Sequence, residues 1–451
     1  MDKQDIKEIV ENLNYLIEAN DEPMIRNIII GLHPADLAEI LHYLNEDNRH
    51  YIFSLLDAET ASDVIAEMDD VSRDTILDDL DEYRISEIVD EMDSDDATDL
   101  VSELPQDIAQ KVLDRIDIED SREVKELMTH EEDTAGGIMA KEFVSVNKNC
   151  TVEQVIRKIR SKAEEVEDIY NIWVVDDQNV LAGTVSLKNL ILADPKTRIS
   201  EIMDTDIVSV KTDMDQEEVA NIAKRYDLVS IPVVNDNGVL VGRITFDDIA
   251  DVMDEEASED IQRMAGIADE EEYRETSILK ISQVRLPWLL VGFVGEMISA
   301  SVLKHFEASL SKIIAAAFFI PIIMAMGGNA GIQSSTIMVR GMATGEIELF
   351  EVRRRLLREF LVSFLNGLIC GLLLFGVVAV ILHQPRFGLL LGGVLFLIIM
   401  FATFNGAFIP VILKKLNIDP AIATGPFITT SNDVLGLLIY LGLITVFLPY
   451  L

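Results

Sequence analysis

Residues 425–450 read GPFITTSNDVLGLLIYLGLITVFLPY, an apolar segment that carries one carboxylate, Asp433. An unpaired carboxylate at bilayer depth costs about 2.5–3.5 kcal/mol on translocon scales and more on other scales. The small and polar residues of the segment recur at helical spacing on one face: Gly425, Thr429, Asp433, Gly436 and Tyr440. We therefore expect Asp433 to face a water-filled path, where a ring of carboxylates, one from each subunit, can select cations.

Five apolar segments in the C-terminal part of the chain predict five membrane-spanning helices. They cover residues 286–303, 313–334, 359–382, 389–413 and 425–450. Each is close to or above the roughly 20 residues that a helix needs to cross the hydrocarbon core of a bilayer. The first segment contains a second carboxylate, Glu296, to which no partner can be assigned from the sequence.

The distribution of Lys and Arg sets the expected orientation in the membrane. Basic residues gather before the first segment, after the second and after the fourth: Arg285, Arg340, Arg353, Arg354, Arg355, Arg358, Lys414 and Lys415. The N-terminus shows neither an apolar signal-peptide core nor a cleavage site, so we expect the N-terminal half to remain in the cytosol. Five spans then place the C-terminus outside, as in a multi-pass protein of the cell membrane.

The charge of the chain is concentrated in its N-terminal part. The formal net charge is -42, and residues 1–275 hold 71 Asp and Glu against 25 Lys and Arg. Nucleic-acid binding needs a basic surface, so this composition excludes it. The only cysteines, Cys150 and Cys370, lie in different parts of the chain and imply no disulfide framework.

Residues 1–130 are expected to be helical throughout. Short apolar-periodic segments recur at 33–44, 60–68, 84–92 and 96–105. A period of roughly 25–35 residues is typical of stacked helical hairpins, which form an α-solenoid. The faces between the apolar positions are very acidic. Such runs are usually solvated helix faces, and a cation-binding surface is the alternative interpretation.

Residues 138–258 contain an internal duplication of β-α-β-β-α character. Each copy has a VSV strand, a helix, a longer apolar strand and a short Gly-containing strand, at 144–186 and again at 208–245. The pattern resembles a tandem pair of CBS domains. Some CBS domains bind adenine nucleotides through Gly-x-x-Thr/Ser-x-x-Asp, which the second copy retains as Gly242, Thr245 and Asp248. ATP binding is one interpretation of these residues, and a purely structural pair that dimerises is the other.

Residues 327–334, GGNAGIQS, interrupt the second apolar segment with small and polar residues. Glycines at membrane depth allow helices to pack closely. Alternatively, the backbone after Met326 unwinds and offers carbonyl groups to a water-filled passage, because irregular backbone is tolerated at this depth where it lines a cavity. In that case the pore-lining backbone positions are Gly327, Gly328, Asn329 and Gly425.

The whole chain resembles the MgtE family of magnesium channels. The matching motifs are EEDTAGGIM at 131–139, EEASEDI at 255–261, GGNAGIQS at 327–334 and DPAIATGPFITTSNDVLGLLIYL at 419–441. One departure is Ile332, where the family commonly has a second Asn. The resemblance implies a multidomain protein with an α plus α/β soluble half and a five-helix transmembrane domain. Its expected parts are an acidic helical domain at 1–130, a CBS pair at 131–258, a connecting plug helix and linker at 247–284, and a transmembrane domain at 285–451.

The resemblance also implies a homodimer with one pore on its axis and a magnesium sensor in its soluble half. The implied ion site is at Asp433, with Asp419 near the inner mouth, and the hydroxyl of Thr429 is suited to holding the ion's water. The sensor carboxylates carried over by motif are Asp95, Asp96, Asp215, Glu217, Asp227, Asp248, Glu256, Glu259 and Asp260.

Magnesium suits these residues because Mg²⁺ gives up its water reluctantly and is often bound with several waters retained. No cluster of Cys and His in the sequence favours a softer metal. Moving a gate from mostly open to mostly closed takes about 5.5 kcal/mol of differential binding. Coupling per site is about 1–3 kcal/mol, so several regulatory Mg²⁺ ions must act together on the carboxylates of the soluble half.

Three other functions are weighed against a channel. An H⁺- or Na⁺-coupled divalent-cation transporter would use Asp433 and Glu296 as a relay. A membrane enzyme is not expected, because the sequence contains no nucleophile–base arrangement or phosphate-binding loop. An anion pathway would need Lys or Arg within the spans, and the five segments contain none.

Overall fold

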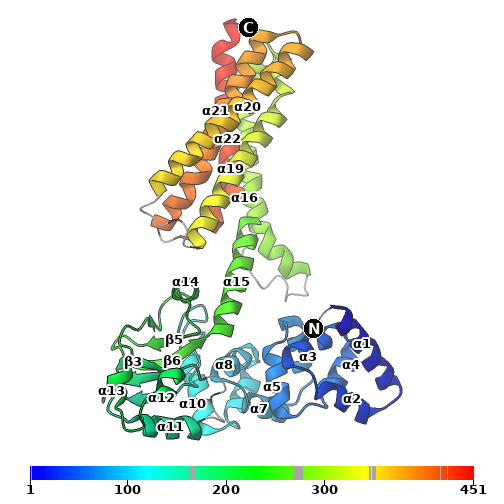
Figure 1. Ribbon diagram of the computed structural model, residues 1–451. Coiled ribbons are helices and arrows are strands. Elements are labelled where there is room, and N and C mark those ends of the chain that lie inside the picture. The colour runs from blue at the N-terminus through cyan, green and yellow to red at the C-terminus, as the bar shows by residue number, and fades with distance from the viewer. Residues whose placement is uncertain are drawn as a thin grey trace. The chain divides into compact units, whose positions relative to one another are not determined.

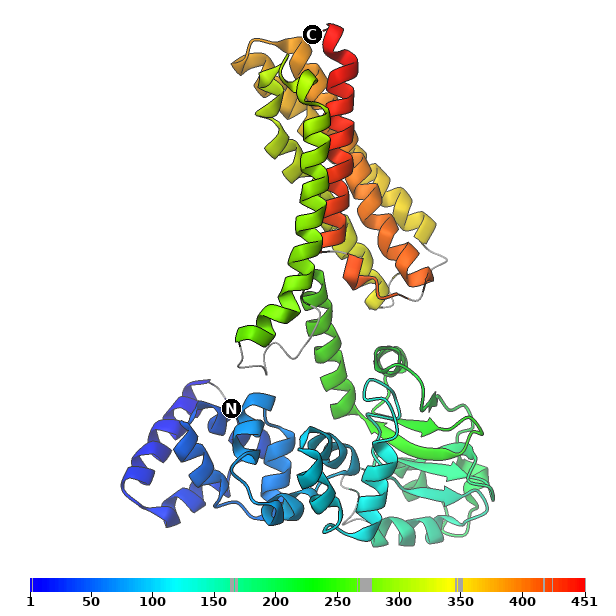
Figure 2. The same cartoon turned by 180° about the vertical axis from the view of Figure 1, so that it is seen from behind.

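The computed structural model describes the chain apart from residues 2, 163–165, 167–168, 266, 268–277, 345–346, 348–351, 417, 424 and 451. The chain forms two compact units, Met1–Met253 and Asp254–Leu451. The first unit contains a row of short helices and two small sheets, and the second is a bundle of long helices (Figures 1 and 2). Residues 268–277, within the linker expected at 247–284, lie outside the described part.

Ten helices occupy the described part of the first 127 residues, which confirms the helical prediction. They are α1 (Lys3–Glu18), α2 (Glu22–Ile29), α3 (Pro34–Tyr43), α4 (Glu46–Phe53), α5 (Ala58–Ala66), α6 (Asp70–Leu77), α7 (Glu82–Val89), α8 (Ser94–Glu103), α9 (Gln106–Leu113) and α10 (Ile118–Leu127). From α2 onward each helix begins 12 residues after the one before it. Alternate helices pack together, α1 on α3, α3 on α5, α5 on α7 and α7 on α9. The structural repeat is therefore a helical pair of 24 residues, shorter than the expected 25–35.

Several of the Asp residues in this region cap the N-terminal ends of these helices. The side chains of Asp57, Asp69, Asp81 and Asp117 each accept a hydrogen bond from a backbone N–H in the first turn of α5, α6, α7 and α10. Such caps satisfy N–H groups that have no partner inside the helix. Replacing these carboxylates would therefore disturb the helices as well as the charge.

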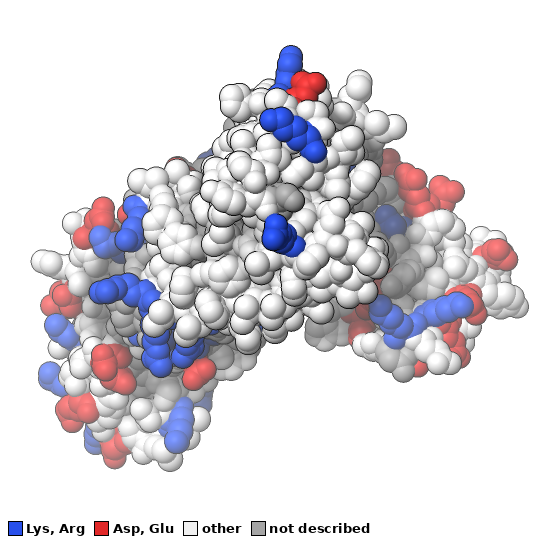
Figure 3. Space-filling view, turned by 90° about the horizontal axis from the view of Figure 1, so that it is seen from above, with Lys and Arg blue, Asp and Glu red and all other residues white. Residues whose placement is uncertain are grey.

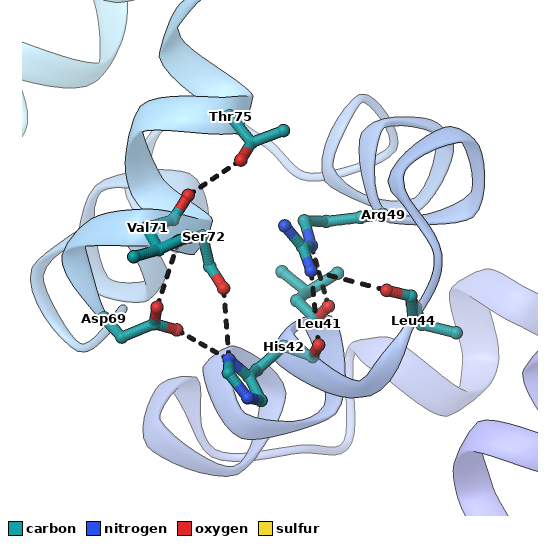
Figure 4. A network of polar contacts seen from close by, with 8 residues as sticks. All are labelled: Leu41, His42, Leu44, Arg49, Asp69, Val71, Ser72 and Thr75. Atoms are coloured by element: carbon teal, nitrogen blue, oxygen red, sulfur yellow. Dashed lines mark hydrogen bonds and ion pairs between the residues drawn. The ribbon is translucent and has the colours of Figure 1, made fainter. Parts of the chain in front are cut away.

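A polar network ties neighbouring repeats together (Figure 4). Arg49 donates from Nε to the carbonyl of Leu41 at 2.9 Å and from its terminal nitrogen to the carbonyl of His42 at 3.2 Å. These bonds satisfy carbonyl groups at the C-terminal end of α3. The His42 ring lies 2.9 Å from the carboxylate of Asp69, which itself caps α6. The network thus links α3, α4 and α6.

The duplication forms two three-stranded sheets of identical topology. The strands are β1 (Ser145–Asn147), β2 (Asn171–Val175), β3 (Leu181–Ser186), β4 (Val210–Lys211), β5 (Ser230–Val234) and β6 (Leu240–Thr245). In each sheet the first strand pairs parallel to the second, and the second antiparallel to the third. The accompanying helices are α11 (Val152–Ser161), α12 (Leu187–Leu192), α13 (Ile199–Ile202) and α14 (Gln216–Tyr226). The predicted paired architecture is confirmed.

A long helix, α15 (Phe246–Ala265), follows β6 and ends within the second unit, as the sequence predicts. The second unit continues with α16 (Ile278–His305), α17 (Glu307–Leu310), α18 (Ile314–Ala317), α19 (Ile320–Ala343), α20 (Val352–Ile381), α21 (Pro385–Lys415), η2 (Ala421–Ala423), α22 (Pro426–Phe447) and η3 (Leu448–Tyr450). Within the described residues, five helical segments are long and apolar enough to span a membrane, which confirms the predicted number. Uncharged residues cover most of the end of this unit that is seen from above, with isolated charges (Figure 3).

The centre of the bundle is α21. About 56% of its most apolar stretch is buried, against 11–28% for the other four spans. It packs along α19 and α20 and also touches α22. By contrast, α20 presents Leu361, Leu365 and Leu372 to the outside, which suits contact with lipid chains.

The glycine-rich run does not unwind. Residues 327–334 lie inside the continuous helix α19, so the prediction of an irregular backbone there is wrong and the close-packing alternative holds. A Cβ atom on Gly406 of α21 would lie 2.2 Å from the backbone oxygen of Gly331. A side chain at this position would push α21 and α19 apart, so glycine permits their close contact.

Candidate metal centres

A cavity of about 600 Å³ opens on the second unit beside α16, α19 and α22, and the last turns of α15 contribute to its wall. Its small and polar lining consists of Gly292, Glu296, Thr336, Gly425, Thr429 and Thr430. On the α15 side it is lined by Ile261, Met264 and Ala265. Hydroxyl and carboxyl groups therefore face a recess within segments that are otherwise strongly apolar.

Glu296 has a partner that the sequence did not reveal. Its carboxyl group lies close to that of Asp433, and α16 and α22 run along each other. The close approach depends on Gly295, because a Cβ atom there would overlap the side chain of Thr430. Glu296 itself is exposed on the surface of the single chain. A carboxylate facing lipid would be costly, so this face is suited to water or a partner chain.

The predicted polar face of α22 divides into two parts. Thr429 lines the cavity and donates from Oγ1 to the carbonyl of Gly425 at 3.3 Å. Further along, Gly436 packs against Met324, and Tyr440 is fully buried with its hydroxyl 2.7 Å from the carbonyl of Ala316. The part of the face beyond Asp433 is thus bundle core, so Tyr440 does not share the water-filled path expected for Asp433.

The glycine-run positions differ in their surroundings. Gly327 packs against Ile398 of α21, and Gly328 is buried. Asn329 is exposed on the single chain. Because all three lie inside α19, their carbonyl groups belong to the helix and are not the free ligands that the unwound interpretation required.

Another carboxylate in the bundle, Glu359 of α20, is held by protein groups. It accepts a hydrogen bond from the hydroxyl of Ser334 at 3.0 Å and lies 3.6 Å from the guanidinium of Arg355. Since its partners account for its charge and burial, we assign it a structural role.

Asp419 is the second predicted pore carboxylate, and it contacts an arginine of α15. Its Oδ2 accepts a hydrogen bond from Arg263 at 2.5 Å, and its Oδ1 accepts one from the backbone N–H of Ala421 at 2.8 Å. Arg263 also forms an ion pair with Glu259, one turn back on α15. The arginine therefore bridges two of the carboxylates that the motif comparison assigned to ion binding.

Asp260 belongs to the same group. Burial, with Asp419 and Glu256 nearby, raises the pKa of Asp260 to about 6. Lys414 acts in the opposite direction. The structure thus brings together Glu256, Asp260 and Asp419, and Arg263 joins Glu259 to this group.

A separate acidic cluster lies at the start of α8 in the first unit. Burial and the nearby carboxylate of Asp248 raise the pKa of Asp96 to about 7, and they raise that of Asp95 well above its usual value. Burial raises the pKa of Asp248 itself to about 6, although hydrogen bonds from Thr245 oppose the shift. Three of the predicted sensor residues therefore converge. Crowded carboxylates of this kind favour either a proton or a cation.

Sequence reasoning missed two members of this cluster. Carboxylate oxygens of Asp93, Asp95 and Glu142 lie within 4.8 Å of one another. Glu142 also accepts hydrogen bonds from the backbone N–H of Ser94 at 3.2 Å and from its hydroxyl at 2.9 Å. It thereby caps α8 from a distant part of the chain, a relationship that no local pattern could indicate.

The remaining predicted sensor residues lie at the two ends of α14. Asp215 caps the helix, accepting a hydrogen bond from the backbone N–H of Glu217 at 2.9 Å. Asp227 ends it with a left-handed backbone, φ 53°. Both positions have a local structural explanation.

The nucleotide motif residues contact each other. Both the backbone N–H and the hydroxyl of Thr245 donate to the carboxylate of Asp248. A small recess of about 10 Å³ near the sheets is lined by Tyr170, Trp173 and Arg243 among others. Asp248 therefore belongs both to the nucleotide motif and to the acidic cluster of α8.

Comparison with known families agrees with this architecture. Residues 32–133 match the MgtE intracellular N domain, residues 135–196 and 199–255 match CBS domains, and residues 320–443 match MgtE, a divalent cation transporter. The magnesium transporter MgtE of Thermus thermophilus is 38% identical over 440 residues, which cover 97% of this chain and 98% of that protein. The chain belongs to the MgtE family. The Bacillus subtilis magnesium transporter MgtE is 36% identical over 94% of each chain.

Two solved structures resemble the soluble half of this MgtE chain. A crystal structure of the soluble part of a magnesium transporter aligns with a TM-score of 0.52 at 31% identity, over 56% of this chain and 99% of that one. The cytosolic domain of the Mg²⁺ channel MgtE in complex with ATP aligns with a TM-score of 0.51 at 37% identity, over 54% and 99%. These findings confirm the predicted fold class, and they confirm a membrane transport protein rather than an enzyme.

Proposed function

We propose that this MgtE chain forms a homodimeric channel that admits Mg²⁺ to the cytosol and closes when cytosolic Mg²⁺ is high. The observation that carries the proposal is the cavity lined by Glu296, Thr429 and Thr430, with the last turns of α15 at its edge. A recess with these groups suits a hydrated cation, and α15 is positioned to obstruct it.

A second copy of the chain would complete the pore. Glu296 is exposed on a membrane-spanning helix, and the cavity is open on one side. Placing two such faces together around an axis would shield both carboxylates from lipid and enclose a polar passage. The carboxylates of Asp433 would then hold Mg²⁺ through its retained water molecules. The hydroxyl of Thr429 would accept a hydrogen bond from these water molecules or donate one to them.

The acidic groups supply the proposed sensor. Like charges at Asp95, Asp96 and Asp248 repel when no cation is present, and a divalent ion between them removes that repulsion. The group around Asp419 would respond in the same way at the end of α15. In this proposal the chain works as four parts, residues 1–130, 131–258, 247–284 and 285–451, with the C-terminus outside the cell.

ATP is proposed as a modulator of the sensor. The support is the solved relative in complex with ATP and the presence of Asp248 in both the nucleotide motif and the acidic cluster. The proposed contacts of the nucleotide in this chain are Thr245 and Asp248.

A coupled transporter is the second candidate, and the contact between Asp433 and Glu296 favours it. Two carboxyl groups at such close range favour binding of a proton, which an H⁺-coupled mechanism could exchange for the cation. An H⁺-coupled carrier would lose uptake when an ionophore collapses the proton gradient, and a channel would not.

The test is Mg²⁺ flux into vesicles that contain the purified protein, measured over a range of Mg²⁺ on the cytosolic side. The wild type should conduct at low cytosolic Mg²⁺ and close as it rises. Asp433→Ala should reduce flux by roughly tenfold or more, the effect of about 1.4 kcal/mol on a barrier. Undiminished flux in this variant, with the protein folded, would refute the proposed pore.

A further inference from the structure

A second cavity of the bundle, of about 1000 Å³, carries two basic side chains. Three segments that are far apart in the sequence line it: residues 312–315, 384–387 and 448–449. Its charged lining consists of Lys312 and Arg386, and its apolar lining includes Ile314, Phe387 and Leu448. Among the described residues, no carboxylate lines the cavity and neither basic side chain forms an ion pair. The cavity therefore presents two positive charges that its own lining does not neutralise.

The cavity lies where the membrane spans end. Two candidate spans, Ile314–Ala343 and Pro385–Lys415, begin beside it, and a third, Phe427–Tyr450, ends beside it. Because the polar head groups of a bilayer flank its hydrocarbon core, we expect the two basic side chains at the level of the head groups. Figure 3 looks onto this end of the bundle, where isolated basic side chains stand out from a largely uncharged surface.

Contacts between the helices hold the walls of this cavity in place. The ring of Phe387 packs edge-on against that of Phe319, with 6.0 Å between the ring centroids. The hydroxyl of Tyr440 donates a hydrogen bond to the carbonyl of Ala316 at 2.7 Å, which ties α18 to α22. Ligand sites are usually preformed cavities of about 300–1,000 Å³. This cavity is at the upper end of that range and has room for a lipid head group.

The lining suits a phospholipid better than a free anion. An arginine fork and a lysine ammonium both form strong charge-assisted hydrogen bonds with phosphate oxygens. A free phosphate ion would leave the apolar walls in contact with water, whereas the glycerol and acyl chains of a lipid would cover them. The apolar surface also continues beyond the cavity, because Leu389 is exposed one turn further along α21 and Val446 is exposed near the end of α22.

We propose that Lys312 and Arg386 bind the phosphate group of an anionic phospholipid, whose acyl chains lie along Ile314 and Leu389. Basic pockets between membrane helices are known to bind lipid head groups. The bound lipid neutralises two like charges that otherwise repel each other. The inference goes beyond the proposed function and requires neither the pore nor its gate, because the cavity is separate from the one lined by Glu296.

The experiment detects lipid contact at this cavity through a single tryptophan. The full-length chain carries Ile314→Trp at an exposed position of the lining, and Trp173→Phe and Trp288→Phe remove the two native tryptophans. The protein is placed in vesicles of phosphatidylcholine and phosphatidylglycerol, and one lipid at a time carries brominated chains that quench tryptophan fluorescence. We expect phosphatidylglycerol to be preferred roughly fivefold or more, the usual contribution of one basic residue near an anionic membrane.

Charge variants test whether the two basic residues cause the preference. Lys312→Gln combined with Arg386→Gln should abolish it. Lys312→Arg combined with Arg386→Lys keeps both charges and should retain most of it, which separates loss of charge from damage to the fold. Lys304→Gln is the matched control, because this exposed lysine near the end of α16 does not line the cavity, and it should leave the preference unchanged.

Equal quenching by the two lipids in the Ile314→Trp protein would overturn the inference, as would a preference that survives the double Gln variant. A preference of the same size for Leu372→Trp, an exposed position of α20 outside the cavity, would also overturn it, because it would indicate general attraction of anionic lipid to the protein. Sodium phosphate is compared with sodium chloride at equal ionic strength. If phosphate alone abolished the preference, the site would belong to a free anion and not to a lipid.

Discussion

Asp433 of α22 and Glu296 of α16 bring their carboxyl groups close together in the membrane-spanning bundle. In the proposed dimer, each chain would thus contribute two carboxyl groups at one depth of the pore. This proximity also explains how Glu296 is accommodated within an otherwise apolar helix, because the carboxyl group meets a polar partner and an open recess.

Glu296→Gln tests whether this second carboxyl group acts on the ion. Because it removes one negative charge beside Asp433, we expect weaker attraction of divalent cations and a Mg²⁺ flux reduced by roughly tenfold, an effect of about 1.4 kcal/mol. Flux in vesicles is the measurement. Glu359→Gln is the matched control, since that carboxylate is bonded to Ser334 within the bundle, and it should not alter the preference for divalent over monovalent cations.

The stability of the first unit should depend on pH when Mg²⁺ is absent. The folded pKa values of Asp96 and Asp248 are raised to about 7 and about 6, so the folded state binds more protons than the unfolded state between about pH 4 and pH 7. Stability must therefore fall as the pH rises through this window. The melting temperature of the soluble region should therefore decrease as the pH rises, and saturating Mg²⁺ should make this decrease smaller. A melting temperature that rises from pH 5 to pH 7 without Mg²⁺ would contradict the assignment.

Asp96→Asn should flatten the same pH profile and raise the melting temperature at pH 7.5 without Mg²⁺, because it removes one of the crowded charges. Asp107→Asn, in the first turn of the neighbouring α9, is a suitable comparison. If the melting temperature changed with pH to the same extent in both variants, the cluster at α8 would not be the cause of the pH dependence.

Ser94→Ala should loosen the junction between α8 and the chain near Glu142. The serine hydroxyl donates to Glu142 at 2.9 Å and accepts from the backbone N–H of Lys141 at 2.8 Å. Loss of these bonds should destabilise the soluble region by about 1–2 kcal/mol, measured by urea unfolding. Ser54→Ala, which removes one exposed hydrogen bond to Tyr51, should cost clearly less.

Gly406→Ala should disrupt the bundle, because the added Cβ would meet the backbone of Gly331. Overpacking of this kind typically costs about 1–3 kcal/mol, and backbone atoms cannot move aside as a side chain can. Gly393→Ala is the control on the same helix, where nothing lies within 4 Å. Thermal stability in detergent should fall for the first variant only; equal stability would mean that α19 and α21 are not closely packed there.

Local patterns in the sequence were sufficient for most of the fold. The helices of residues 3–127, the paired sheets, α15 and the five spans each follow from periodicity or apolar length, which the neighbours of a residue in sequence determine. The glycine run was harder, since the same residues suit an unwound backbone and a tight helix contact. Only the position of Gly331 against Gly406 distinguishes them.

The contacts within the candidate sites could not be predicted from local sequence patterns. Single residues such as Asp433, Asp419 and Asp248 stood out by motif, yet their partners lie far away in sequence. Glu296 meets Asp433 across 137 positions of the printed sequence, and Arg263 meets Asp419 across 156. Side-chain contacts over such separations depend on tertiary packing, which no periodicity encodes.

The N-terminal helices begin at a constant interval of 12 residues, so this part of the chain can be divided into equivalent structural units. Helices that begin at Glu46 and Asp70 occupy equivalent places in successive 24-residue pairs. If one whole pair were deleted, each remaining helix would still pack against a helix from the equivalent position in the next pair. If a single helix were deleted, the helices that follow would lie on the wrong side of the row. Related proteins could therefore gain or lose one helical pair at a time. The N-terminal helical domain would change in length, and the contacts between its helices would stay the same.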